Sequence, residues 1–87
     1  MDRIHLILAS SRGERYECMT SSVTLPSTYG SLGILANHAP MLCEVKEGTL
    51  RCRNEAGETL HIRVSDGIAH VADNELRLLL SHMEIEE

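Results

Sequence analysis

Residues 50–64 read LRCRNEAGETLHIRV, and this stretch decides the fold class. Both halves alternate apolar with polar residues, which is the period-two pattern of a half-buried β-strand. The segment between them, Asn54–Gly57, is rich in turn formers, and Gly57 can adopt the positive φ that a tight turn needs. The stretch therefore predicts an antiparallel hairpin with one apolar and one polar face. The residues predicted to face inward are Leu50, Cys52, Leu60, Ile62 and Val64.

The same alternation runs through the chain before this hairpin. Residues 4–9 predict a first strand, which ends at the polar turn 10–13. Residues 16–25 predict a second strand, which we expect to end at Pro26 because proline cannot donate to a ladder. One face of this second strand is predicted to hold Met19, Val23 and Leu25.

The remaining segments predict further short strands. Residues 27–40 are rich in Gly, Ser, Asn and Pro, and they predict loops around a small hairpin. Strands are predicted at residues 41–45, 68–71 and 75–80, with turns at 46–48, 66–67 and 73–74. Residues 84–87 predict a frayed acidic tail, so the predicted domain spans residues 1–83.

Many short strands joined by tight turns are typical of a sandwich or barrel. The predicted fold class is all-β: a small flattened β-sandwich or barrel of about eight to ten short, mostly antiparallel strands. The chain has 87 residues, which is room for one domain. Its core has to come from Leu, Ile, Val, Met and Cys, because Phe and Trp are absent and only two Tyr are present.

Composition and charge argue against several classes of partner. Thirteen acidic and eight basic residues give a net charge of -5, and no basic cluster is present, so we expect no nucleic-acid partner. The apolar stretch at residues 4–9 is too short for a signal peptide or a membrane span, so we expect the isolated chain to be soluble. Three cysteines fit neither a zinc motif nor a disulfide framework, which favours a reducing compartment.

The residues that could carry chemistry form no recognisable site. No two histidines occupy positions i and i+2 of one predicted strand, as they would to converge on a metal from one strand. Cys18, Cys43 and Cys52 lie in no nucleophile motif, so we expect them to be core filler. Glu55 and Glu58 flank a turn and are expected to be solvated. We therefore predict no catalytic residue, no cofactor and no metal. The histidines are His5, His38, His61, His70 and His82.

Residues 30–40 read GSLGILANHAP, a specific sequence that strand and turn rules leave unexplained. This segment resembles the signature of the epsilon subunit of F-type ATP synthases, which is called delta in mitochondria. Tyr16, residues 22–26 and residues 64–68 fit flanking segments of that family, so the resemblance covers nearly the whole chain. The matching signature positions are Gly30, Leu32, Gly33, Ile34, His38, Ala39, Pro40, Leu42 and Gly48.

Three positions depart from the family pattern. Cys18 stands where the family has a glycine after the aromatic residue, and Asp66 replaces the first residue of a Gly-Gly pair. The family's usual proline is also replaced, so that Ala36 and Asn37 precede His38. Asn and Asp tolerate turn geometry, so two of these changes can keep the backbone path. Family members typically carry a C-terminal helical hairpin after the sandwich, and this chain stops near the point where it would begin. We therefore expect the sandwich without the hairpin, and no small-molecule ligand.

The resemblance implies a non-catalytic rotor subunit in the central stalk of an F-type ATP synthase. Such a subunit links the gamma subunit to the membrane c-ring and couples ion-driven rotation to ATP synthesis. Its implied place is peripheral, on the cytoplasmic side of a bacterial cell membrane. For the c-ring contact we expect Tyr29, Gly30, Ser31, Leu32 and Gly33. For the gamma contact we expect Ser10, His38, Ala39, Pro40, Met41 and Cys43.

Two other functions remain open at this stage. The histidines could serve a small metal-binding β-barrel enzyme, or the chain could be an unrelated β-sandwich adaptor module. His38 also has two interpretations of equal weight: a direct gamma contact, or a turn residue that holds its loop through a backbone hydrogen bond.

Overall fold

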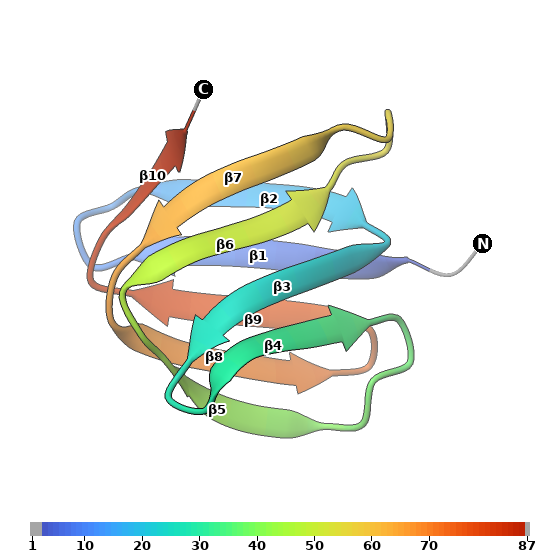
Figure 1. The fold of residues 1–87 in the computed structure, drawn as a ribbon, viewed down its shortest axis with the longest axis horizontal. Coiled ribbons are helices and arrows are strands. Elements are labelled where there is room, and N and C mark those ends of the chain that lie inside the picture. The colour runs from blue at the N-terminus through green and yellow to red at the C-terminus, as the bar shows by residue number, and fades with distance from the viewer. Residues whose placement is uncertain (1–2, 87) are drawn as a thin grey trace.

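The computed structural model describes residues 3–86, and these form ten β-strands (Figure 1). No helix occurs among the described residues. The strands are β1 (Ile4–Ser10), β2 (Arg15–Thr20), β3 (Ser22–Ser27), β4 (Gly30–Leu35), β5 (Met41–Val45), β6 (Gly48–Arg53), β7 (Thr59–Val64), β8 (Gly67–Ala72), β9 (Glu75–Leu80) and β10 (Met83–Glu86).

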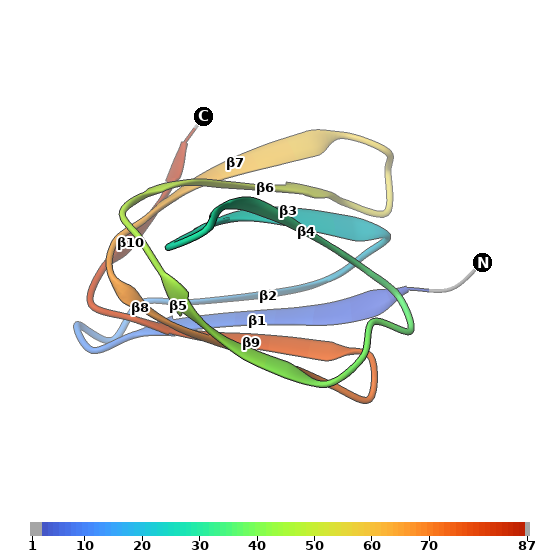
Figure 2. The ribbon, with the colours of Figure 1, turned by 60° about the horizontal axis from the view of Figure 1, so that its bottom comes forward.

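The strands form two facing layers, which Figure 2 shows nearly edge-on. One layer has the order β10-β7-β6-β3-β4 and the other the order β5-β8-β9-β1-β2. A single residue pair, Ser27 with Val45, joins the layers through β3 and β5. The ladders are antiparallel except that between β1 and β9, which is parallel. The predicted all-β, mostly antiparallel sandwich is confirmed.

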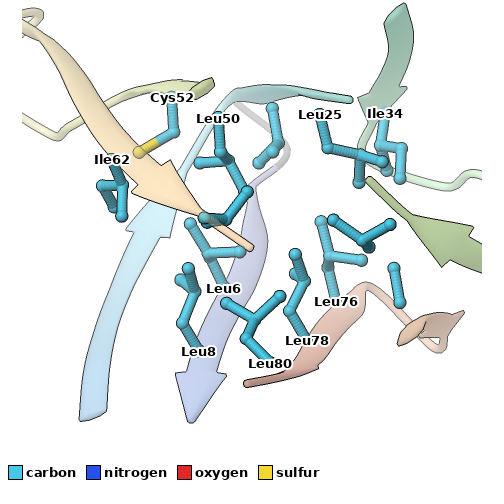
Figure 3. Packing of buried hydrophobic residues seen from close by; sticks show 14 of the residues in the cluster. Leu6, Leu8, Leu25, Ile34, Leu50, Cys52, Ile62, Leu76, Leu78 and Leu80 are labelled. Atoms are coloured by element: carbon cyan, nitrogen blue, oxygen red, sulfur yellow. The ribbon is translucent and has the colours of Figure 1, made fainter. Parts of the chain in front are cut away.

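The core lies between the layers and is built from alternate strand residues, as the period-two pattern requires (Figure 3). The hairpin predicted from residues 50–64 is confirmed: Leu50 pairs with Ile62, and Gly57 has φ +87°. The fully buried side chains of greatest volume are Ile4, Leu6, Leu8, Leu25, Ile34, Leu50, Ile62, Leu76, Leu78, Val23, Val45 and Val64.

The single strand predicted over residues 16–25 is wrong, because the chain changes layer at Ser21. Thr20 and Val23 both point inward, so the odd–even alternation switches at this break, and Met19 is exposed. The Thr20 hydroxyl interacts with the Arg53 backbone and with the Ser22 carbonyl. Because these hydrogen bonds satisfy the Thr20 hydroxyl, this polar side chain can be buried at a position that the period-two pattern predicts to face outward.

Pro26 does not end its strand, which is a second correction. β3 continues to Ser27 and pairs with β4 along its whole length. The Pro26 carbonyl accepts a hydrogen bond of 3.1 Å from the Lys46 N–H, away from β4. Since the N–H and C=O of one strand residue point to the same side, the missing proline N–H removes no bond from the β3–β4 ladder.

The acidic end is ordered as far as it is described. Glu84 and Glu86, predicted to belong to a frayed tail, lie in β10 opposite Arg63 and His61 of β7. Met83 is buried at the start of this strand, which fixes its register against the core. The last residue of the predicted tail, Glu87, lies outside the described residues.

Candidate partner-binding surfaces

The β3–β4 turn presents the first predicted contact region, residues 29–33. Tyr29 at its tip is 94% exposed, and Gly30 has φ +101°. The buried Ser27 hydroxyl donates to the Gly30 carbonyl at 2.7 Å and accepts from the Tyr29 N–H at 3.1 Å. These bonds hold the turn in shape. Four of the five predicted c-ring residues are exposed here, whereas Leu32 packs against the core.

His38 lies in the β4–β5 connection, which forms a tight corner. Its Nδ1 is 2.8 Å from the Ala39 carbonyl oxygen, and since a carbonyl only accepts, Nδ1 carries the proton. The His38 N–H also donates to the Leu35 carbonyl at 3.2 Å. The interpretation of His38 as a turn residue that holds its loop is therefore confirmed. Asn37 adopts φ +65°, as expected for a residue that tolerates left-handed geometry.

Not all residues predicted for the gamma contact share one surface. Ser10 ends β1 and lies at the opposite end of the sandwich from the His38 corner (Figure 1). Its hydroxyl donates to the Glu14 carboxylate at 2.8 Å and accepts from two backbone N–H groups of its own turn. Cys43 points into the core from β5, and burial raises the pKa of its thiol. His38, Ala39, Pro40 and Met41 stay together in the corner and at the start of β5.

An apolar stripe on the outer face of β5, β8 and β9 escaped the sequence prediction. It consists of Leu42, Ile68 and Leu79, whose exposed fractions are 67%, 50% and 67%. Ile68 lies directly opposite Leu79, and Leu42 is the diagonal neighbour of Ile68 across the β5–β8 ladder. The signal was present in the three successive leucines 78–80, because period two forces the middle one to the other face.

Charged groups on the same face pair mainly with one another. His5 lies between two carboxylates, with Nε2 3.1 Å from Glu17 and Nδ1 3.8 Å from Glu75. The hydrogen bonds from His5 and then from Arg15 lower the pKa of Glu17. Arg77 pairs with Glu75 at 2.5 Å. Because these charged groups already pair with one another, the apolar stripe is the part of this face that a partner could cover with a gain in buried apolar area.

Within 3–86, His, Cys, Asp and Glu side chains form no group of three or more suited to a metal ion. Over the same part of the chain, no helix has the length and hydropathy to cross a membrane. His61 and His70 are exposed on different layers, and Cys52 is buried as predicted.

Comparison with known proteins identifies the family. The sequence profile described as "ATP synthase, Delta/Epsilon chain, beta-sandwich domain" matches residues 3–86. The chain belongs to this family. It is 41% identical over 69 residues to the ATP synthase epsilon chain of Synechococcus sp. strain PCC 6716, covering 79% of this chain and 49% of that one. It is 43% identical over 61 residues to that of Synechocystis sp. strain PCC 6803, covering 70% and 44%.

Solved structures agree with this family fold. A chain of the Euglena gracilis mitochondrial ATP synthase matches with a TM-score of 0.86 and 22% identity, over 98% of this chain and 54% of that one. A chain from the Tetrahymena thermophila mitochondrial ATP synthase, in a structure of the central stalk and c-ring, matches with a TM-score of 0.75 and 18% identity, over 93% and 65%. This epsilon-family chain spans about half the length of the curated relatives that it matches. Family membership excludes the alternative that the chain is an unrelated β-sandwich adaptor module.

Proposed function

We propose that this epsilon-family domain is the coupling part of a rotor subunit in an F-type ATP synthase. In this role it binds the gamma subunit and the c-ring, and it transmits ion-driven rotation without catalysing a reaction itself. Its place is then peripheral, at the cytoplasmic side of a bacterial cell membrane, held there by the complex. The family match over residues 3–86 supports this function.

The apolar stripe is the observation that carries the proposal. Three large apolar side chains with at least half of their surface exposed lie together on an 87-residue domain. Grouped exposed apolar residues on a soluble domain mark an interaction surface. Leu42 is the second residue of β5, so the stripe begins two residues after Pro40, at the end of the corner that holds His38, Ala39 and Pro40. Met41, between Pro40 and Leu42, packs partly against the core. We assign this combined surface to gamma, without Ser10 and Cys43.

The Tyr29 turn supports a second contact at the other end of the domain. β4 runs from this turn to the His38 corner, so the two regions lie at opposite ends of one strand (Figure 1). An exposed tyrosine on a turn held by Ser27 suits recognition of polar loops, because its ring gives contact area and its hydroxyl a hydrogen bond. We assign Tyr29, Gly30, Ser31 and Gly33, with the half-buried Leu32 as their anchor, to the c-ring.

Co-purification with the gamma subunit of the same organism tests the proposal. We expect the unaltered chain to be retained by tagged gamma, and Leu79→Asp to weaken retention about tenfold or more, because a charge would be buried at the contact. Thr59→Asp, an exposed change on the opposite layer, is the matched control and should be retained normally. No retention of the folded, unaltered chain, or equal loss by both variants, would overturn the proposal.

A further inference from the structure

The two layers leave a seam where β2 faces the layer β10-β7-β6. β2 forms a ladder with β1, and within residues 3–86 no backbone ladder joins it to the opposite layer. Side chains bridge the seam instead. Thr20 Oγ1 donates to the Arg53 carbonyl and accepts from the Arg53 N–H at 3.2 Å. At the far end Glu14 accepts from the Met83 N–H at 3.1 Å.

Two cysteines lie on the facing strands β2 and β6 between these bridges. Cys18 lies two residues before Thr20, on the same inward face of β2. Cys52 precedes Arg53 and is directed into the core from β6, as Figure 3 shows. Cys18 packs against the buried cluster that contains Cys52. The hydrogen bonds between Thr20 and the Arg53 backbone hold β2 close to β6 across the seam, next to Cys18 and Cys52.

The ionisation of Cys52 agrees with this placement. Burial, then the charge of Cys18 and a hydrogen bond with it, raise the pKa of Cys52 to about 12. Tyr16, also on β2, is the other titratable group that faces the pair, and burial and Cys18 raise its pKa to about 12. The residues opposite Cys52 on its own layer, Val23 and Leu60, are uncharged. The raised pKa of Cys52 thus reflects both its burial and the nearby Cys18 thiol.

We propose that Cys18 and Cys52 are a reversible disulfide site that closes the seam between β2 and β6. The oxidant is a small disulfide of the glutathione class or a peroxide. With a disulfide oxidant, the half-exposed Cys18 attacks first: its thiolate bonds to one sulfur of the oxidant and releases one thiol. Cys52 thiolate then attacks the Cys18 sulfur and releases the second thiol. Two electrons pass from the cysteines to the oxidant, and two protons end on the released thiols.

The cross-link has consequences for stability and for rate. It closes the chain between residues 18 and 52, which restricts the unfolded state and should lower the unfolding constant about a hundredfold to a thousandfold. The second step needs the Cys52 thiolate. Because burial raises the pKa of this thiol, ring closure should become faster as the pH rises from about pH 7 to about pH 9.

The test uses oxidised glutathione on the folded chain and on Cys43→Ser. We expect the unaltered chain to keep one free thiol, Cys43, and Cys43→Ser to keep none, each as a monomer whose mass falls by about 2 Da. Cys52→Ser should stop as the Cys18–glutathione adduct, and the reduced chain should unfold at a lower urea concentration than the oxidised one. Two glutathione adducts on Cys43→Ser, two unreacted thiols, or a rate of closure independent of pH would overturn the proposal.

Discussion

The outer faces of the two layers differ in what they present to solvent. On one layer, β5, β8 and β9 expose Leu42, Ile68 and Leu79. On the other, the outward positions of β6 and β7 are polar or charged. Those outward residues include Arg51, Arg53, Thr59, His61 and Arg63. Both faces come from the same alternation, and core packing constrains neither, so the difference between them fits the partner contact proposed for the apolar stripe.

Charge pairing sharpens this contrast. On the polar layer Arg63 lies opposite Glu84, and His61 lies opposite Glu86, in the β7–β10 ladder. Opposite charges on neighbouring strands stabilise such a face modestly while it remains solvated. The apolar stripe has no comparable charge pairs to stabilise the isolated chain. The comparison separates an apolar stripe over β5, β8 and β9, which we assign to a partner, from the polar outer positions of β6 and β7. The second layer still exposes one large apolar side chain, Leu35 of β4, to 61%.

Two neighbouring leucines of β9 provide the largest expected effect. Leu78 is 1% exposed and Leu79 is 67% exposed. Leu78→Ala should lower the free energy of unfolding by about 2–5 kcal/mol, because it leaves a cavity in the core. Leu79→Ala should change it by less than about 0.5 kcal/mol. Urea unfolding followed by circular dichroism measures both.

Equal losses from the two alanine variants would break the comparison, since the outward leucine would then be part of a packed core. If Leu78→Ala is unfolded even without urea, the expected ranking still holds, provided that Leu79→Ala remains folded.

A glycine pair tests how tightly the apolar layer is held together. A Cβ at Gly67 would lie 2.1 Å from the Leu79 backbone oxygen, so Gly67→Ala must push β8 away from β9. We expect a loss of about 1–3 kcal/mol, as for overpacked sites. Gly33 on β4, in the other layer, has open space around its Cβ position, and Gly33→Ala is the control.

The control should stay within about 0.5 kcal/mol of the unaltered chain by thermal or urea unfolding. A Gly67→Ala variant as stable as Gly33→Ala would show that the β8–β9 contact can relax, and would weaken the assignment of a fixed apolar stripe.

The smallest effect concerns the seam where the two layers meet at Glu14. Hydrogen bonds from the Met83 N–H and from Ser10, with the charge of His82, hold the pKa of Glu14 below its usual 4.5. Its carboxylate therefore adds stability above that pH, and the contribution is lost as the pH falls through the lower folded-state pKa. Glu14→Gln should lower stability slightly at neutral pH and reduce the loss of stability on acidification.

Urea midpoints measured from about pH 7 to about pH 3 check this sign. Glu44→Gln, at an exposed position of β5, is the control and should keep the acid-side loss of the unaltered chain. A Glu14→Gln variant with an unchanged pH profile would contradict the role of Glu14 as a pin across the seam.

Local pattern predicted the hairpins well and the change of layer poorly. The turn at Asn54–Gly57 and the turn at Asp73–Asn74 follow from residues that accept positive φ, and Gly57, Asp73 and Asn74 adopt it. Nothing local marks Ser21 as the point where the chain changes layer, because that depends on the bond between Thr20 and Arg53, 33 residues away. The prediction that the strand ends at Pro26 was wrong for a similar reason. Whether the missing proline N–H removes a ladder hydrogen bond depends on where β4 and Lys46 lie.

The candidate surfaces show the same division. The signature at residues 30–40 directed attention to the His38 corner and to the Tyr29 turn just before it. Short-range hydrogen bonds of His38 and Ser27 hold these two segments in shape. The apolar stripe was missed, since Leu42, Ile68 and Leu79 come from three strands that only the sheet order brings together. Likewise, sequence alone could not separate Ser10 from the His38 corner.

By itself, the sequence determined an all-β chain, the inward residues of most strands and the positions of its tight turns, because alternation and turn preference act over a few residues. Only the tertiary structure decided which strands are neighbours, where the seam lies, that Cys18 and Cys52 lie on facing strands, and that one outer face carries an apolar stripe. These depend on contacts between distant segments, and a two-residue period says which side of a strand is buried but not what that strand will meet.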